Sequence, residues 1–213
     1  MGWHMRRTAA AVVLTIFLLF PVLSVSGCTK TPDDAYRDAG TAYEREDYQT
    51  AYRLLKPLAE SGRADAQFAI GNMYYRGKGV SQDYTEAMRW FRKAAEQNLA
   101  VAQHYLGEMY YEGKGVPQDF GQADMWNRRA AEQGYVLAQG LRGDMYFSGK
   151  GLPKDYILAH MWYSLSISRF PPEWKALQKA TERARDLVAS MMTPDQIAEA
   201  QKLAREWKPK MER

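Results

Sequence analysis

The sequence predicts an all-α fold, an α-solenoid of antiparallel helix hairpins with C-terminal capping helices. A period of roughly 20 to 50 residues is typical of units that must stack because none buries its own apolar face. The apolar residues follow helical spacing, and no long alternating run indicates a strand. The residues at six positions recur in three copies, 36 residues apart: Gly71, Tyr74, Gly77, Gly79, Asp83 and Trp90; Gly107, Tyr110, Gly113, Gly115, Asp119 and Trp126; and Gly143, Tyr146, Gly149, Gly151, Asp155 and Trp162.

The N-terminus is predicted to direct export. Two arginines precede an apolar run over residues 9–25, which is typical of a secretory signal peptide and short for a membrane span. The run leads into Val25-Ser26-Gly27-Cys28, which resembles a bacterial lipobox. We therefore expect residues 1–27 to be removed and Cys28, the only cysteine, to carry a lipid. An uncleaved anchor or a cut at an ordinary signal site is the alternative.

A lipid on Cys28 would hold the protein at a membrane, facing the periplasm or the cell surface. Several acyl chains on one residue anchor a protein durably, because each buried methylene contributes about 0.8 kcal/mol. Thr29 stands where an aspartate would favour the inner membrane, so the outer membrane is the expected location. Residues 28–34 then form the tether between the lipid and the first helix.

The repeat array is expected to cover residues 35–168. In the first full unit we expect helix A over residues 65–76, a loop through Gly77-Lys78-Gly79-Val80, and helix B over residues 84–97. The first unit is shorter because about five loop residues are missing. The units are 35–65, 66–101, 102–137 and 138–168.

Each unit also carries its own signals for where helices end and how they pack. Gly77 and Gly79 supply the positive φ angles that end helix A, and Asp83 is placed to cap helix B. Tyr74 and Trp90 are expected to fill the space between the two helices. Small residues allow the helix backbones to approach one another: Ala66, Gly71, Ala87 and Ala94.

The repeat pattern stops after Trp162, and residues 169–208 are expected to form capping helices. Pro171-Pro172 ends the last repeat helix, and a stripe at helical spacing follows. Thr193-Pro194-Asp195-Gln196 opens a final helix with a capping box. Residues 209–213 are a tail. The stripe comprises Trp174, Leu177, Thr181, Ala184, Val188 and Met191, and the apolar face of the last helix comprises Ile197, Ala200, Leu203, Ala204 and Trp207.

These motifs together resemble the Sel-like repeat, the longer-looped relative of the tetratricopeptide repeat. The resemblance covers residues 35–168 and implies a right-handed solenoid. It also implies a binding scaffold that assembles or regulates other proteins, often in the bacterial envelope, without naming the partner. The motifs that carry it are Ile70-Gly71-x-x-Tyr74, Gly77-Lys78-Gly79-Val80, Asp83-Tyr84, Ala87-x-x-Trp90 and Ala94-Ala95.

Composition and motifs argue against several other function classes. The 46% hydrophobic and 25% charged residues are ordinary for a folded protein. Basic residues are interspersed with acidic ones along the helices and form no stripe or cluster, so we expect no nucleic acid partner. No Ser-x-x-Lys or Gly-x-Ser-x-Gly element supports a serine nucleophile. His104 and Glu108, four residues apart, are more typical of a solvated helix face than of a metal site. We therefore expect no catalytic residue, no cofactor and no metal.

An envelope enzyme acting on β-lactams or peptidoglycan is the alternative function. Family members that are rich in paired cysteines have been linked to β-lactam binding or hydrolysis. This chain has none of those cysteines, since Cys28 stands alone. The resemblance therefore favours a non-catalytic scaffold.

The copies differ mainly on one face of helix A, which we interpret as the binding surface. Positions i, i+4 and i+8 share a face, and the resemblance places that face on the concave wall. Neighbouring aromatic residues offer apolar anchors for a protein or peptide partner of the envelope. The alternative is an unselected solvent face. The candidate residues are Phe68, Asn72, Tyr75 and Arg76; His104, Glu108, Tyr111 and Glu112; and Asp144 and Phe147, with Gly140 and Ser148 at the equivalent positions of the third copy.

Overall fold

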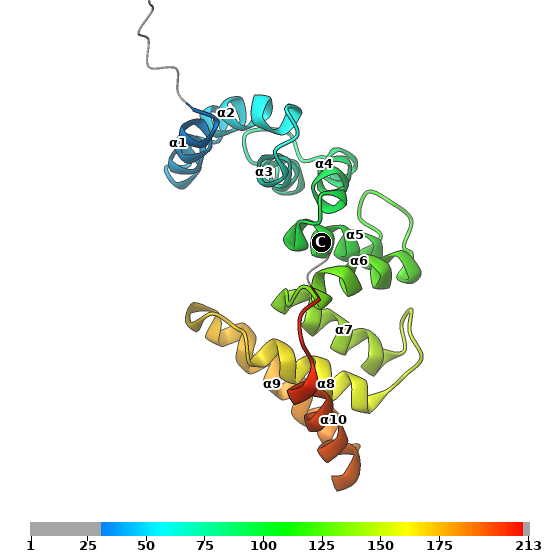
Figure 1. Cartoon of the computed structure of the whole chain (residues 1–213). Helices are drawn as coiled ribbons and strands as arrows, with labels where there is room; N and C mark the ends of the chain where they lie inside the picture. Colours follow the sequence, from blue (N-terminus) through cyan, green and yellow to red (C-terminus); the bar gives the residue numbers. More distant parts are fainter. Residues whose placement is uncertain (1–30, 211–213) are drawn as a thin grey trace, which may run out of the picture. The chain divides into compact units, whose positions relative to one another are not determined.

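The computed structural model describes residues 31–210, and the helices from Pro32 onward form one compact unit. The predictions for the signal peptide over residues 1–27 and for Cys28 lie outside the described residues. Within residues 31–210 the chain is helical and contains no strand (Figure 1). The elements are α1 (Pro32–Glu44), α2 (Tyr48–Glu60), α3 (Ala64–Arg76), α4 (Tyr84–Glu96), α5 (Ala100–Glu112), α6 (Phe120–Glu132), α7 (Val136–Ser148), α8 (Tyr156–Ile167), a 3-10 turn (Pro172–Trp174), α9 (Lys175–Ala189) and α10 (Pro194–Glu206).

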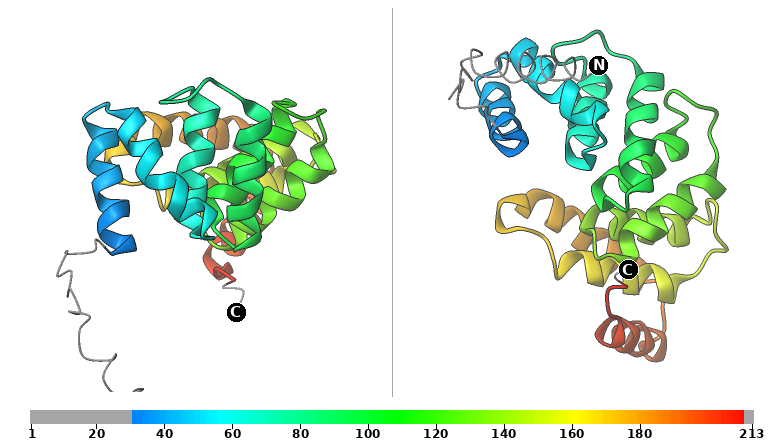
Figure 2. Two further views of the ribbon diagram at one scale, coloured as in Figure 1. Left: turned by 90° about the horizontal axis from the view of Figure 1, so that it is seen from above. Right: turned by 45° about the horizontal axis from the view of Figure 1, so that its top comes forward.

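The helices pack in chain order as four hairpins, α1/α2, α3/α4, α5/α6 and α7/α8, each stacked on the next. Figure 2 shows this order, because helices of neighbouring colour lie side by side in both views. The first helix of each hairpin is helix A and the second is helix B. This arrangement confirms the solenoid of helix hairpins. Helix A of the three full units begins at Ala64, Ala100 and Val136, in each case two residues before the predicted start of the unit. In the first of these units, the helix itself was expected to begin at residue 65.

The loop glycines end helix A and also join one unit to the next. Gly77 adopts φ 66°, and its N–H donates to the carbonyl of Met73, which closes the last turn of α3. Gly79 adopts φ 72°, and a Cβ placed there would lie 2.5 Å from the carbonyl oxygen of Tyr48. The loop is therefore seated on the first residue of the preceding helix B. Gly115 and Gly151 make the same close approach to the first residues of α4 and α6.

Buried glutamines connect the units through the interior. Gln103 Nε2 donates to the carbonyl of Ala95 at 3.2 Å, and its Oε1 accepts from Gln133 Nε2 at 2.8 Å. The pair of Gln67 and Gln97 repeats this bond one unit earlier. These bonds satisfy amide groups that would otherwise be costly to bury. The sequence analysis did not identify them.

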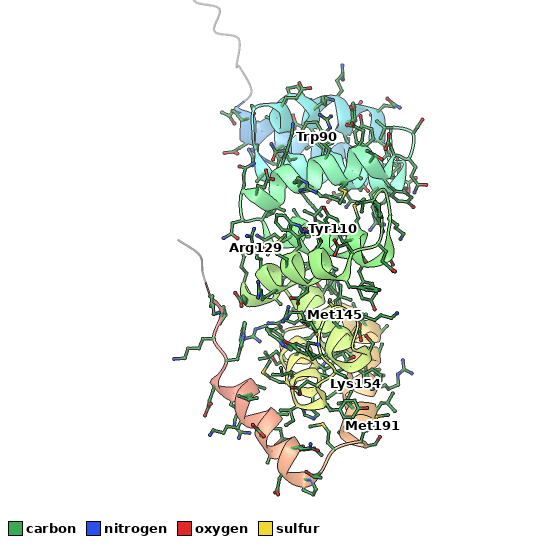
Figure 3. The ribbon with its side chains drawn as sticks, turned by 90° about the vertical axis from the view of Figure 1, so that its right-hand side faces the viewer. Trp90, Tyr110, Arg129, Met145, Lys154 and Met191 are labelled. Carbon is green, nitrogen blue, oxygen red and sulfur yellow. The ribbon has the colours of Figure 1, made fainter. Side chains whose placement is uncertain are left out.

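The large aromatic residues occupy the places expected for them between the helices. Trp90 and Tyr110 are buried within the array (Figure 3), and Tyr74 is half-buried. The alanines at the predicted close approaches are fully buried, including Ala66, Ala87 and Ala94. Small side chains at these points let the hairpins pack closely.

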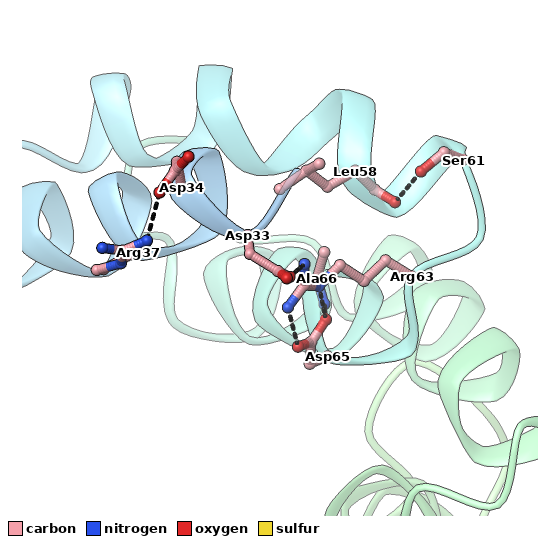
Figure 4. A network of polar contacts seen from close by, with 8 residues as sticks. All are labelled: Asp33, Asp34, Arg37, Leu58, Ser61, Arg63, Asp65 and Ala66. Atoms are coloured by element: carbon pink, nitrogen blue, oxygen red, sulfur yellow. Dashed lines mark hydrogen bonds and ion pairs between the residues drawn. The ribbon is translucent and has the colours of Figure 1, made fainter. Parts of the chain in front are cut away.

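An ion-pair network joins the first unit to the second. Arg63 Nε donates to Asp65 Oδ1 at 2.8 Å, and the same guanidinium pairs with Asp33 at the start of α1 (Figure 4). The guanidinium carbon of Arg63 also lies 4.5 Å from the ring centroid of Tyr36. These contacts hold the start of α1 against the start of α3.

The C-terminal helices cover the end of the array through α8. Both α9 and α10 pack on α8. Leu203, Ala204 and Trp207 of α10 cover the apolar cluster around Trp162, as expected of a capping helix. The stripe predicted on α9 is buried mainly at its C-terminal part, where Val188 packs in one cluster with Ala159 and Tyr163 of α8. Trp174, Leu177, Leu187 and Met191 are exposed, and Met191 lies at the edge of the array (Figure 3).

The residues after α10 return to the array at their described end. The backbone N–H of Lys210 donates to the carbonyl of Glu132 at 2.7 Å, and its Nζ lies 3.3 Å from the Glu132 carboxylate. Lys210, which was predicted to belong to the tail, is therefore bound to the end of α6.

Candidate functional site

The candidate residues lie on helices A, mainly α3, α5 and α7, and they fall into three groups. In Figure 1, α1 and α3 lie on the inner side of the curve that α2 and α4 follow. The first group is an aromatic cluster, the second a charged patch and the third a pair of half-buried rings on α5 and α7. One further candidate, His104, is placed differently from the prediction.

The aromatic cluster joins α3, α4 and α5. The ring centroid of Tyr105 lies 5.4 Å from that of Phe68, 5.2 Å from Phe91 and 5.9 Å from Tyr75. Phe68 and Tyr75 were both predicted to line the binding surface, and both are half-buried. Their rings therefore offer edges to solvent while they hold the second and third units together.

The charged patch combines α3, α5 and the loop after α5. Lys114 Nζ lies 2.6 Å from Glu112 Oε2 and donates to the hydroxyl of Tyr75 at 3.0 Å. Arg76 Nε donates to Asn72 Oδ1 at 2.6 Å. Burial and the neighbouring Glu112 raise the pKa of Glu108, while Lys114 and Arg76 oppose that shift. Five predicted residues thus share one patch: Asn72, Tyr75, Arg76, Glu108 and Glu112.

Lys114 is a member of this patch that the sequence analysis missed. Its position was interpreted as part of a structural turn, since Lys78 and Lys150 recur there. In the structure each lysine reaches back to aromatic rings of the preceding unit. Lys78 Nζ lies 4.3 Å from the ring centroid of Tyr48, and Lys150 Nζ lies 5.7 Å from that of Tyr111. The repetition itself was the available signal.

His104 is a packing residue, which corrects its place among the groove residues. It is 6% exposed, and its Nδ1 lies 2.9 Å from Asn127 Oδ1. Tyr105 and Tyr135 pack against the imidazole, with centroids at 5.9 Å and 5.3 Å. Burial lowers the pKa of His104 to about 4, against the opposing effect of its hydrogen bond to Asn127. The neutral ring is therefore part of the interior between α5 and α6.

The third group extends the surface toward the C-terminal units. Asp144 accepts a hydrogen bond from the Tyr163 hydroxyl at 2.6 Å. Desolvation of the Asp144 carboxyl raises its pKa, while this hydrogen bond opposes the shift. The rings of Tyr111 and Phe147 are half-buried and lie against the first residues of α6 and α8. These residues continue the helix A surface with fewer exposed charges than the patch on α3 and α5.

A cavity of about 320 Å³ lies at the N-terminal end of the helix A surface, between α1, α2 and α3. The sequence analysis did not identify it, because the first unit was interpreted only as a shorter copy of the others. Its walls are mostly apolar. The lining residues are Tyr36, Ala39, Gly40, Tyr43, Glu44, Leu55, Phe68, Ala69 and Asn72.

Residues 31–210 contain neither a cluster of metal ligands nor a membrane-spanning helix. No group of three or more His, Cys, Asp or Glu side chains in this part of the chain is arranged to hold a metal ion. None of the helices described has both the length and the apolar character needed to cross a membrane.

Comparisons with known proteins identify the family. The Sel1 repeat matches residues 37–62, 64–99, 100–135 and 136–169. A solved structure, a protective antigen present in uropathogenic Escherichia coli strains displaying an SLR fold, is 32% identical with a TM-score of 0.72; the match covers 83% of this chain and 37% of that one. A Sel1 repeat protein from Oxalobacter formigenes is 27% identical with a TM-score of 0.65, over 81% of this chain and 70% of that one.

The chain thus spans about a third of the length of the Escherichia coli antigen. A search of curated proteins finds no match. Four consecutive matches to one repeat cover well over half of the chain, and the stacked hairpins with their glycine loops agree with them. The chain belongs to the Sel1 repeat family.

Proposed function

We propose that this protein is a non-catalytic scaffold of the bacterial cell envelope that binds an extended segment of a partner protein on its helix A surface. The observation that carries the proposal is the charged patch beside the aromatic cluster. Arg76 and Glu112 are exposed there, next to the half-buried ring of Tyr75. Such a surface provides apolar contact for affinity and opposite charges for orientation.

The repeat architecture supports the proposal independently. Units that contact only their neighbours build a long continuous surface, and Sel1 repeats generally mediate interactions between proteins. The glycine loops, the buried glutamines and the aromatic cluster hold this surface in one conformation. A rigid surface loses little conformational entropy when a partner binds.

The proposal is tested by reversing the polarity of the patch without changing the net charge. In the variant that combines Arg76→Glu with Glu112→Lys, the two exposed charges exchange sign. The purified chain and this variant are used as bait for partners in an envelope extract. The partner that the parent captures is expected to be lost, because like charges now meet at contacts where opposite charges met before.

The matched control exchanges two exposed charges elsewhere, Lys179→Glu on α9 with Glu199→Lys on α10. This control should capture the partner as the parent does. Both variants should unfold within about 1 kcal/mol of the parent, since surface substitutions rarely exceed that cost. Equal capture by the patch variant and the parent would contradict the proposed surface.

Attachment to the envelope is proposed to occur through a lipid on Cys28. The basis is the lipobox-like sequence that ends at this residue. Mass spectrometry of the N-terminal peptide from the membrane-bound protein should show an acylated Cys28 as the first residue. The Cys28→Ser variant should lose the acyl mass, and an acyl group elsewhere, or none, would contradict this attachment.

A further inference from the structure

The cavity in the first unit occupies a space that the next unit fills with an aromatic ring. The first interval is the space between α1, α2 and α3, and the second interval is the equivalent space between α3, α4 and α5. In the second interval Tyr105 occupies this space, with its ring 5.2 Å from Phe91 and 5.9 Å from Tyr75. The first interval contains the cavity of about 320 Å³ instead.

The difference follows from three substitutions between equivalent positions. Ala69 stands where the second interval has Tyr105, Leu55 stands where it has Phe91, and Glu44 stands where it has Tyr75. Each is smaller or lacks a ring. The equivalent glycines of the two A helices, Gly71 in the second interval and Gly40 in the first, show the same difference. A Cβ added to Gly71 would lie 2.7 Å from Phe91, whereas a Cβ added to Gly40 would meet nothing within 4 Å.

The walls of the cavity are held in place by contacts behind them. Arg63, which is paired with Asp33 and Asp65, lies 4.5 Å from the ring of Tyr36. The ring of Tyr43 meets that of Tyr48 edge-on at 5.0 Å. Phe68 packs against Phe91 at 5.5 Å. The site is therefore formed before any ligand arrives, which reduces the entropic cost of binding.

We propose that the cavity in the first interval binds one aromatic side chain of the partner's extended segment, with a neighbouring basic residue that pairs with Glu44. This inference rests on the proposed function and identifies the chemistry of the segment. The second interval shows that an aromatic ring suits this position between neighbouring A helices. The volume is at the lower end for small-molecule sites, which suits a single side chain.

The basic neighbour follows from the charge at the rim. Glu44 is exposed, and within residues 31–210 it makes no ion pair or hydrogen bond. It is the only acidic residue that lines the cavity. A lysine or arginine beside the buried ring would bring its charge to this carboxylate.

The test uses the purified chain with alanine methyl groups labelled for NMR, because Ala39 and Ala69 both line the cavity. The probe is the peptide acetyl-Ser-Phe-Lys-Ser-amide. We expect it to shift the methyl signals of these two alanines. A peptide with alanine in place of phenylalanine should bind at least tenfold more weakly, since burial of a whole aromatic side chain is lost. A peptide with glutamate in place of lysine should bind about threefold more weakly, as expected of an exposed pair.

Two variants locate the binding. Ala69→Tyr combined with Leu55→Phe introduces the residues of the second interval and should abolish peptide binding, while filling a cavity tends to maintain or raise stability. Glu44→Lys should retain the preference for phenylalanine and reverse the preference for lysine over glutamate. The control, Ala176→Tyr on the exposed start of α9, adds the same ring elsewhere and should bind like the parent.

Other occupants would overturn the inference. Signals of Ala39 and Ala69 that respond to dilution of the protein would indicate a second copy in the cavity. Signals that change on removal of residues 1–28, before any peptide is added, would indicate the N-terminal segment. The filled variant is the one that combines Ala69→Tyr with Leu55→Phe, and unchanged peptide binding by it would also contradict the inference. If the filled variant still captures the partner while the exchange at Arg76 and Glu112 prevents capture, this inference fails and the proposed function stands.

Discussion

Several differences between repeats are explained by pairs of residues that pack across the hairpin. Phe91, Asn127 and Tyr163 occupy equivalent positions on helices B, each against a helix A glycine. Phe91 packs on Phe68, Asn127 binds His104, and Tyr163 binds Asp144. Close packing couples such positions, because a change in one side chain leaves a gap or a clash for the other. Part of the variation on helix A therefore reflects interior packing.

The buried imidazole of His104 predicts that acid destabilises the protein. The folded state lowers the pKa of this ring to about 4, whereas an unfolded chain has a value near 6.5. The unfolded state therefore binds more protons between these values. The contribution of the neutral His104 ring to the free energy of unfolding is therefore complete above about pH 6.5 and is lost as the pH falls toward 4. The expected loss is roughly 2 kcal/mol at pH 5.

Urea unfolding at pH 7 and pH 5 measures this effect. The variant His104→Gln keeps a polar group near Asn127 but cannot be protonated, so its stability should depend less on pH than that of the parent. His160, whose pKa burial also lowers, is compared through His160→Gln. An identical loss of stability in the parent and in His104→Gln would refute the assignment.

At the scale of the helix, local signals determine most boundaries. Asp83, Asp119 and Asp155 each accept hydrogen bonds from backbone N–H groups in the first turn of a helix B, as predicted for Asp83. Thr193 and Gln196 form the predicted capping box of α10. Helix α9 differs, because Trp174, Leu177 and Met191 of its apolar stripe are exposed, whereas Val188 is buried against residues of α8. An amphipathic pattern thus predicts a helix more securely than it predicts burial.

The cap of α4 is expected to contribute about 1 kcal/mol. Asp83 Oδ1 accepts from the N–H groups of Thr85 and Glu86 at 2.9 Å and 3.0 Å. Asp83→Ala removes both bonds and the favourable charge at the helix N-terminus, so the free energy of unfolding should fall by about this amount. Asp83→Asn retains an acceptor and should lose less. Thermal unfolding of both variants makes the comparison, and equal losses would show that the cap bonds are not responsible.

At the scale of the whole molecule, the stack of hairpins leaves an apolar surface at its C-terminal end. Trp207 meets Trp162 edge-on at 6.2 Å, and the guanidinium of Arg169 lies 4.6 Å from the ring of Trp207. Leu203 and Ala204 complete the cover over Ala130, Ala131 and Leu165. Because each unit contacts only its neighbours, the loss of this cover should first destabilise the last hairpin.

Trp207→Ala should therefore lower the free energy of unfolding by roughly 2 kcal/mol, through the loss of buried aromatic area. Trp174→Ala is the matched control, because Trp174 is exposed at the start of α9. Trp174→Ala should lower the free energy of unfolding by less than half as much as Trp207→Ala. Hydrogen exchange would show whether protection is lost first in α7 and α8. Equal effects of the two substitutions would contradict the capping role of α10.

The sequence by itself determined the all-α class, the repeat units and the ends of most helices in the array. These features depend on residues within one or two turns, such as Gly77, Gly79 and Asp83, so they can be interpreted without knowledge of distant partners. The recurrence of the same residues every 36 positions then implied stacking. The residues of the charged patch other than Lys114 were predicted for the same reason, because helical spacing alone places Asn72 and Arg76 on one face.

Only the tertiary structure decided which of these positions face solvent and which face the interior. His104 and Asn127 meet from helices separated by 23 positions in the chain, and Lys114 reaches Tyr75 across 39. The cavity in the first interval depends on Glu44, Leu55 and Ala69 from three helices. Burial and cavity volume are sums over neighbours that are distant in sequence, so no local pattern specifies them, whereas helix ends are set by bonds within a single turn.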